Sequence, residues 1–139
     1  MRTPLVVIAV CLLLVACRAP YAPVAIIEEY HPQQPWADVR VEAKGRAGDY
    51  LTTIWITNLT DQPIEISPGC FLMEDAQGNP FDFYDWAYFG ETRSTPHTPR
   101  PLGPRLSTHG LVRWYSRMGY SASLLRVILA GEEHAFEFQ

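Results

Sequence analysis

Apolar and polar side chains alternate along much of this chain from Trp36 onward, and this alternation constrains the fold more than any other feature. Over residues 39–44, apolar residues take every second place and charged residues take the places between them. A period of two puts all the apolar side chains on one face of an extended segment, so the pattern predicts a half-buried strand. Residues 49–58 alternate in the same way, with Ile54 and Ile56 on the face opposite Trp55.

The pattern continues to the last residue in short segments that are separated by turn-forming residues. The further strands are expected at residues 64–66, 71–73, 81–83, 110–115, 124–130 and 134–139. Between two of them, residues 75–79 resemble a hairpin loop in which Gly78 takes the left-handed conformation. About seven to eight short strands at close spacing, without a long helical period, predict an all-β sandwich.

Composition excludes several classes of protein. Hydrophobic residues make up 47% and aromatic residues 12% of the chain, which is far from the composition of a disordered chain. The formal net charge is −4, and no basic patch of the kind that binds nucleic acid is visible, so no nucleic-acid partner is predicted. Three cysteines are too few for a disulfide framework.

The N-terminal residues form a candidate targeting signal. Residues 5–15 are uninterruptedly apolar and follow Arg2. The run is too short to span a bilayer, which takes about 20 residues, but it suits the core of a signal peptide. It ends in Leu14-Val15-Ala16-Cys17, which resembles a bacterial lipobox. The resemblance implies that residues 1–16 are removed and that Cys17 receives a diacylglycerol and an N-acyl chain such as palmitate. No other cofactor is expected.

A lipidated Cys17 implies a location in the cell envelope. Because Arg18 rather than Asp follows it, lipoprotein sorting implies the periplasmic face of the outer membrane in a Gram-negative cell. In a cell with one membrane, the resemblance implies the outer face of that membrane. The alternative is an ordinary secreted protein in which Cys17 is incidental. An acylated Cys17 leaves Cys70 without a partner, so Cys70 is expected to be a small buried residue rather than a reactive thiol.

Residues 17–35 contain four prolines and are expected to form an extended tether between the lipid and a domain that spans residues 36–139. Within the tether, residues 24–30 are apolar enough to add an edge strand to the domain instead.

Several runs within the predicted domain resemble one family in their order. They resemble the telokin-like, immunoglobulin-type domain of small secreted bacterial proteins and lipoproteins. The runs are Tyr50–Asn58, Pro63–Pro68, Phe71–Asp75 and Gly78–Phe81, with Gly110–Trp114 and Leu124–Leu129 fitting the second half. The resemblance implies an immunoglobulin-like β-sandwich over residues 36–139 and supplies no active site, because the matching positions are structural. The paired cysteines of antibody domains are missing.

One segment is dense in aromatic residues and is a candidate binding surface. Six of the nine residues 81–89 are aromatic, and alternation places Phe81 and Phe83 in the core. The others are harder to bury on one strand, and aromatic side chains with polar groups are frequent in binding hot spots. The candidate binding residues are therefore Tyr84, Trp86, Tyr88 and Phe89. The alternative is that they cap the open end of the sandwich.

The following residues, 90–107, combine four prolines with arginines. Long segments without regular structure are often functional, so Arg100 and Arg105 are further candidate contacts. The alternative is an ordered crossover between the two sheets.

No catalytic arrangement is visible. The serines lack the Gly-x-Ser-x-Gly context of a nucleophile, and the histidines, methionines and cysteines form no closely spaced pair, so no metal site is predicted. We therefore expect a lipid-anchored, non-catalytic interaction or structural module. It is expected to bind the membrane through its lipid and an envelope protein through residues 84–107. The alternative is a carrier of a small ligand or of a metal such as copper.

Overall fold

The computed structural model describes residues 20–30, 35–87 and 100–139, although not the side chains of residues 29, 30 and 84–87. These residues form eleven strands and one short 3-10 helix, which confirms the all-β class. The elements are β1 (Ala22–Val24), β2 (Ile26–Tyr30), β3 (Ala37–Arg46), β4 (Asp49–Asn58), β5 (Ile64–Ile66), η1 (Pro68–Cys70), β6 (Phe71–Glu74), β7 (Asp82–Ala87), β8 (Arg100–Leu102), β9 (Ser107–Tyr115), β10 (Leu124–Leu129) and β11 (Glu132–Phe138).

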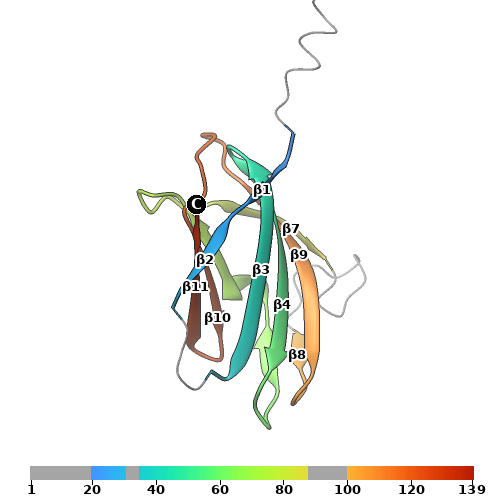
Figure 1. Ribbon diagram of the computed structural model, residues 1–139. Helices are drawn as coiled ribbons and strands as arrows, with labels where there is room; N and C mark the ends of the chain where they lie inside the picture. The colour runs from blue at the N-terminus through green and yellow to red at the C-terminus, as the bar shows by residue number, and fades with distance from the viewer. Residues whose placement is uncertain (1–19, 31–34, 88–99) are drawn as a thin grey trace, which may run out of the picture.

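The strands form two main sheets that lie face to face, as Figure 1 shows. One sheet has five strands in the order β1-β3-β4-β9-β7, and the other has four in the order β2-β11-β10-β6. A small third sheet pairs β5 with β8. Every pairing is antiparallel. The apolar side chains that alternate along the strands meet between the two main sheets and form one core.

The sequence correctly assigned the faces of the long strands. Ile54 and Ile56 of β4 are fully buried, whereas Trp55 between them is only half-buried. The largest core side chain is Trp114 of β9, which is 1% exposed. Its indole Nε1 donates a 3.1 Å hydrogen bond to the hydroxyl of Thr52, and that hydroxyl donates to the carbonyl of Val112 at 3.2 Å. The indole N–H is therefore satisfied inside the core.

The turn between β3 and β4 is shorter than expected, and the Tyr50 ring explains why a glycine stands beside it. The sequence placed a turn at residues 45–48, but Gly45 lies inside β3, directly opposite Tyr50. A Cβ atom at Gly45 would lie 2.4 Å from the Tyr50 ring, so the ring occupies the space that a side chain would need. The same ring packs edge-on against Phe81 and Phe138, at 5.7 and 5.9 Å between centroids.

The predicted loop at residues 75–79 is confirmed in its conformation but differs in its connection. Gly78 has a φ of 83°, in the left-handed region, and the Asp75 carboxylate accepts hydrogen bonds from the backbone N–H groups of Gln77 and Asn79. The flanking segments form a single bridge, between Glu74 and Pro80, and then separate. β6 joins the four-stranded sheet and β7 the five-stranded sheet, so the loop carries the chain across the sandwich.

The structure places the middle of the predicted tether in the sheets. β1 pairs with β3 and β2 pairs with β11, each as an edge strand. This is the alternative that the sequence left open for residues 24–30, and in the described residues the first strand begins at Ala22 rather than near Trp36. Edge strands tolerate proline because one side of the backbone makes no ladder hydrogen bonds, which accounts for Pro23 in β1.

Candidate interaction surface

The five-stranded sheet has one face turned away from the core, which we call the outer face. Most of its side chains are exposed or half-buried, and they come from alternate positions on three neighbouring strands. They include Arg40, Glu42 and Lys44 of β3, Leu51, Thr53 and Trp55 of β4, and Leu111 and Arg113 of β9.

Apolar side chains lie along the middle of the outer face, and charged side chains lie around them. Leu51, Trp55 and Leu111 are half-buried, and the Arg40 guanidinium lies over the Trp55 ring at 4.1 Å from its centroid. A cation over an aromatic face at this distance is attracted by the ring quadrupole. Apolar side chains within a polar rim are the composition of many protein contact surfaces.

A small pocket lies on the outer face beside β1. Its volume is about 270 Å³, and its lining residues are Pro23, Glu42, Ala43, Lys44, Leu51 and Thr53. Pockets that enclose drug-sized ligands run from about 300 to 1,000 Å³, so this one falls below that range. Glu42 and Lys44 supply one charge of each sign, which suits a small polar group or a protruding side chain of a partner.

Three side chains, those of Tyr21, Arg46 and Arg113, meet around the buried carboxylate of Asp49 at the end of the outer face where β1 begins; with Asp49 they form what we call the Asp49 cluster. Asp49 is 8% exposed. Arg113 donates to both of its oxygens, from Nε at 3.2 Å and from Nη2 at 3.1 Å, and Arg46 donates at 3.3 Å. The Tyr21 hydroxyl donates to the same carboxylate, and its ring lies 4.6 Å below the Arg46 guanidinium.

The cluster shifts two pKa values in opposite directions. Burial by itself would raise the pKa of Asp49, but hydrogen bonds from Arg113, Tyr21 and Arg46, together with the charge of Arg113, hold that pKa below its usual value. Burial raises the pKa of Tyr21, and the neighbouring Asp49 carboxylate raises it further. At neutral pH, Asp49 is therefore charged and Tyr21 keeps its proton, which is the pairing that their hydrogen bond requires.

The sequence did not find this cluster. Tyr21 falls in the predicted tether and lies 92 residues from Arg113, so no local spacing brings the two together. The one local signal is the pair Arg46 and Asp49, three residues apart on the two sides of the β3–β4 turn.

The aromatic segment predicted to bind a partner lies partly in β7. The β7 backbone is an edge strand of the five-stranded sheet and pairs with β9, where Asp85 lies opposite Arg113 and Trp86 opposite Val112. Its residues 84–87 therefore belong to the sheet that carries the outer face. The side chains of Tyr84 and Trp86 lie outside the described residues, and so do the whole residues Cys17, Tyr88 and Phe89.

The two arginines predicted as contacts lie outside the sheet of β7. Arg100 is half-buried on β8, opposite Ile66 of β5, and thus belongs to the small third sheet rather than to the sheet of β7. Arg105 lies in the loop after β8 and forms a 3.2 Å ion pair with Asp61, both side chains being exposed. Exposed ion pairs contribute little stability, about 0–1 kcal/mol, so this pair by itself does not hold the loop.

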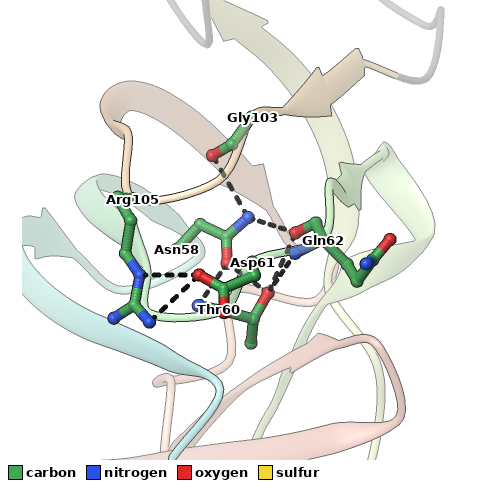
Figure 2. A network of polar contacts seen from close by, with 6 residues as sticks. All are labelled: Asn58, Thr60, Asp61, Gln62, Gly103 and Arg105. Carbon is green, nitrogen blue, oxygen red and sulfur yellow. Dashed lines mark hydrogen bonds and ion pairs between the residues drawn. The ribbon is translucent and has the colours of Figure 1, made fainter.

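The side chain of Asn58 joins that loop to the β4–β5 turn, as Figure 2 shows. Its Nδ2 lies 2.7 Å from the carbonyl oxygen of Gln62, 3.0 Å from that of Leu102 and 3.2 Å from that of Gly103. Its Oδ1 accepts from the backbone N–H and the hydroxyl of Thr60. Every polar atom of this fully buried amide therefore has partners, and the network has a structural role.

The possible metal ligands lie on separate elements. In residues 20–30, 35–87 and 100–139, no group of three His, Cys, Asp or Glu side chains could hold a metal ion. His109 is exposed on β9, whereas His134 is buried on β11, where its Nε2 lies 3.0 Å from Glu132. Cys70 is half-buried rather than fully buried, with its sulfur 3.6 Å from the Ser67 hydroxyl.

No family model, no curated protein and no solved structure matches this chain. Over the part of the chain that the structure describes, no helix has the length and apolar character needed to cross a membrane.

Proposed function

We propose that this protein is a lipid-anchored protein of the cell envelope whose β-sandwich serves as a non-catalytic interaction or structural module. The observation that carries the proposal is the short stretch of chain between the lipobox-like sequence and the folded domain. The lipobox-like sequence ends at Cys17, and only four positions later Tyr21 is held by the Asp49 cluster. A lipid on Cys17 would thus attach to a residue next to the folded domain.

We also propose that the sandwich is immunoglobulin-like and related to the telokin-like domains. The strand order supports this. With β1 and β2 set aside, the sheets read β3-β4-β9-β7 and β11-β10-β6. In chain order these correspond to strands ABED and CFG of a constant-type immunoglobulin domain.

The proposed contact surface consists of residues 84–107, as the sequence predicts, together with the outer face of the sheet that β7 joins. Half-buried apolar side chains and a small pocket on the outer face support this surface. The edge position of β7 supports it too, because a partner can approach an edge strand from the side. The partner in this proposal is a protein of the same envelope.

The lipid anchor is tested by labelling the protein with an alkyne analogue of palmitate in a bacterium that processes lipoproteins. We expect the native protein to carry the label and to sediment with membranes. The Cys17→Ser variant should lose the label and leave the membrane fraction, whereas the control variant Cys70→Ser should retain both properties. Labelling of the Cys17→Ser variant, or a native protein without label, would refute the anchor.

The interaction surface is tested by crosslinking in the intact envelope. Photoreactive residues at positions 86 and 88 are compared with one at Glu133, which is exposed on β11 of the opposite sheet. We expect one dominant protein adduct from positions 86 and 88 and none from position 133. A folded protein that gives no adduct at 86 and 88, or the same adducts from all three, would refute the surface.

A further inference from the structure

At one end of the sandwich the N-terminal chain enters the domain, and several aromatic and apolar side chains are exposed. Figure 1 shows the start of β1, the β3–β4 turn, the β9–β10 loop and the C-terminus at this same end. Hydrogen bonds confirm that two of these segments touch: the backbone N–H of Gly48 donates to the carbonyl of Tyr120 at 2.9 Å, and that of Ser116 donates to the carbonyl of Gly48 at 2.8 Å.

The β9–β10 loop begins with a tight turn over residues 116–120, which we call the apical turn. The backbone N–H of Gly119 donates to the carbonyl of Ser116 at 3.1 Å, so Arg117 and Met118 occupy the two corner positions. Met118 is 72% exposed and Tyr120 is 38% exposed. Arg117 is exposed as well. The turn therefore presents an apolar, an aromatic and a cationic side chain together.

The position of the apical turn is held by a close contact between two backbones. A Cβ atom at Gly48 would lie 2.8 Å from the Cα of Gly119 and 2.9 Å from the carbonyl oxygen of Ser116. The absence of a side chain at position 48 is what lets the two turns dock. Because the docking also uses the two backbone hydrogen bonds of Gly48, the exposed side chains are presented from a fixed support.

The Asp49 cluster brings the N-terminal chain to this end of the molecule. Tyr21 bonds to Asp49, which begins β4 immediately after the β3–β4 turn, and Ala22 pairs with Gly45 just before that turn. From Tyr21 back to Cys17 there are four residues, which span at most about 14 Å even when fully extended. A lipid on Cys17 therefore keeps this end of the sandwich against the bilayer surface.

We propose that the apical turn contacts the headgroup region of the bilayer that holds the lipid anchor, with Met118 and Tyr120 entering the interface and Arg117 at the phosphates. This inference rests on the proposed lipidation of Cys17. Tyrosine is enriched at membrane interfaces because its ring is apolar and its hydroxyl is polar. Arginine is attracted to anionic headgroups and forms bidentate bonds with phosphate. The contact would orient the sandwich with the apical turn at the membrane and the Asn58 network at the end farthest from it.

The test uses the full-length lipidated protein in vesicles of phosphatidylethanolamine and phosphatidylglycerol. In a Cys70→Ser background, a fluorophore is attached to Met118→Cys and, for comparison, to Gln62→Cys, which is exposed in the β4–β5 turn at the opposite end. A nitroxide near the headgroup on a lipid acyl chain and aqueous iodide serve as the two quenchers. We expect the lipid nitroxide to quench position 118 several-fold more than position 62, and iodide to show the reverse.

The outcomes separate this inference from the one on which it rests. If the labelled proteins fail to sediment with the vesicles, the lipid anchor itself is refuted. If they sediment but the nitroxide quenches both positions alike or neither, only the membrane contact of the apical turn is refuted. A fluorophore at position 118 that is shielded from iodide and also unquenched by the nitroxide would assign the turn to a second copy or a protein partner, which also overturns the inference.

Discussion

Replacing Asn58 by aspartate tests the polar network of Figure 2 with almost no change in shape. The substitution exchanges the Nδ2 amide group for an oxygen at the position that lies within 3.2 Å of three carbonyl oxygens, those of Gln62, Leu102 and Gly103. The two hydrogens of the amide are lost, and the oxygen that replaces the nitrogen faces acceptors only, while the other oxygen keeps its donors from Thr60.

The expected cost follows from these contacts. Loss of two buried donors, with acceptors left unsatisfied, costs about 1–1.5 kcal/mol each, or about 2–3 kcal/mol together. Asn58 is fully buried, and a charged carboxylate with one oxygen that has no donor at that site adds about 2 kcal/mol or more. We therefore expect the free energy of unfolding of Asn58→Asp to fall by about 4–5 kcal/mol at pH 7, which is a large part of the 5–15 kcal/mol that is typical of a domain.

Urea unfolding followed by tryptophan fluorescence measures this difference, with the buried Trp114 as a reporter. The control is Gln62→Glu, which adds the same charge to the same turn at an exposed position and should change stability by less than about 0.5 kcal/mol. At pH 4 the variant carboxyl is largely protonated and donates one hydrogen bond, so its deficit should shrink. A loss below about 1 kcal/mol at pH 7, or an equal loss at both pH values, would refute this account of Asn58.

Three further predictions concern the core, the β3–β4 turn and the Asp49 cluster. Thr52→Val keeps the side-chain volume but leaves the buried Trp114 indole N–H without an acceptor. Thermal unfolding should therefore show a loss of stability of about 1–3 kcal/mol, and an unchanged melting temperature would contradict this prediction. Gly48→Ala and Gly131→Ala both place alanine at a positive φ, which costs about 1–2 kcal/mol of stability. Only at Gly48 would the new Cβ also meet backbone atoms within 3 Å, so urea unfolding should show the larger loss of stability for Gly48→Ala. Equal losses for the two variants would refute the docking of the two turns. Because the pKa of Asp49 is depressed in the fold, its charged form stabilises the protein above the unfolded-state pKa of about 3.9, and this contribution disappears as pH falls through the folded-state pKa. The stability difference between the native protein and Asp49→Asn should therefore narrow below about pH 4. A difference that stays constant with pH would contradict this prediction.

The long strands could be predicted from the sequence because their signal is local. In β4, Ile54 and Ile56 alternate with Trp55, and a period of two records which face is buried without reference to any other part of the chain. The start of β9 was missed for the same reason. Its first residues, Ser107–His109, are polar and carry no apolar alternation, and their pairing with β4 makes them a strand.

The prolines near the N-terminus led to a predicted tether because proline disfavours the interior of a sheet. That rule concerns central strands, and whether a strand lies at an edge depends on which other strands are present. Pro23 lies opposite Lys44 at the edge of the five-stranded sheet, which no property of residues 17–35 alone could reveal.

The sequence alone thus predicted the all-β class, the buried faces of the long strands and a lipobox-like targeting signal, all of which depend on residues close together in the chain. The Asp49 cluster and the docking of the apical turn on Gly48 arose only from the fold. They join segments separated by more than 60 residues, and in the docking the groups that meet are backbone atoms. Side-chain patterns report how each strand faces the core, whereas the pairing of distant strands sets which side chains and turns become neighbours.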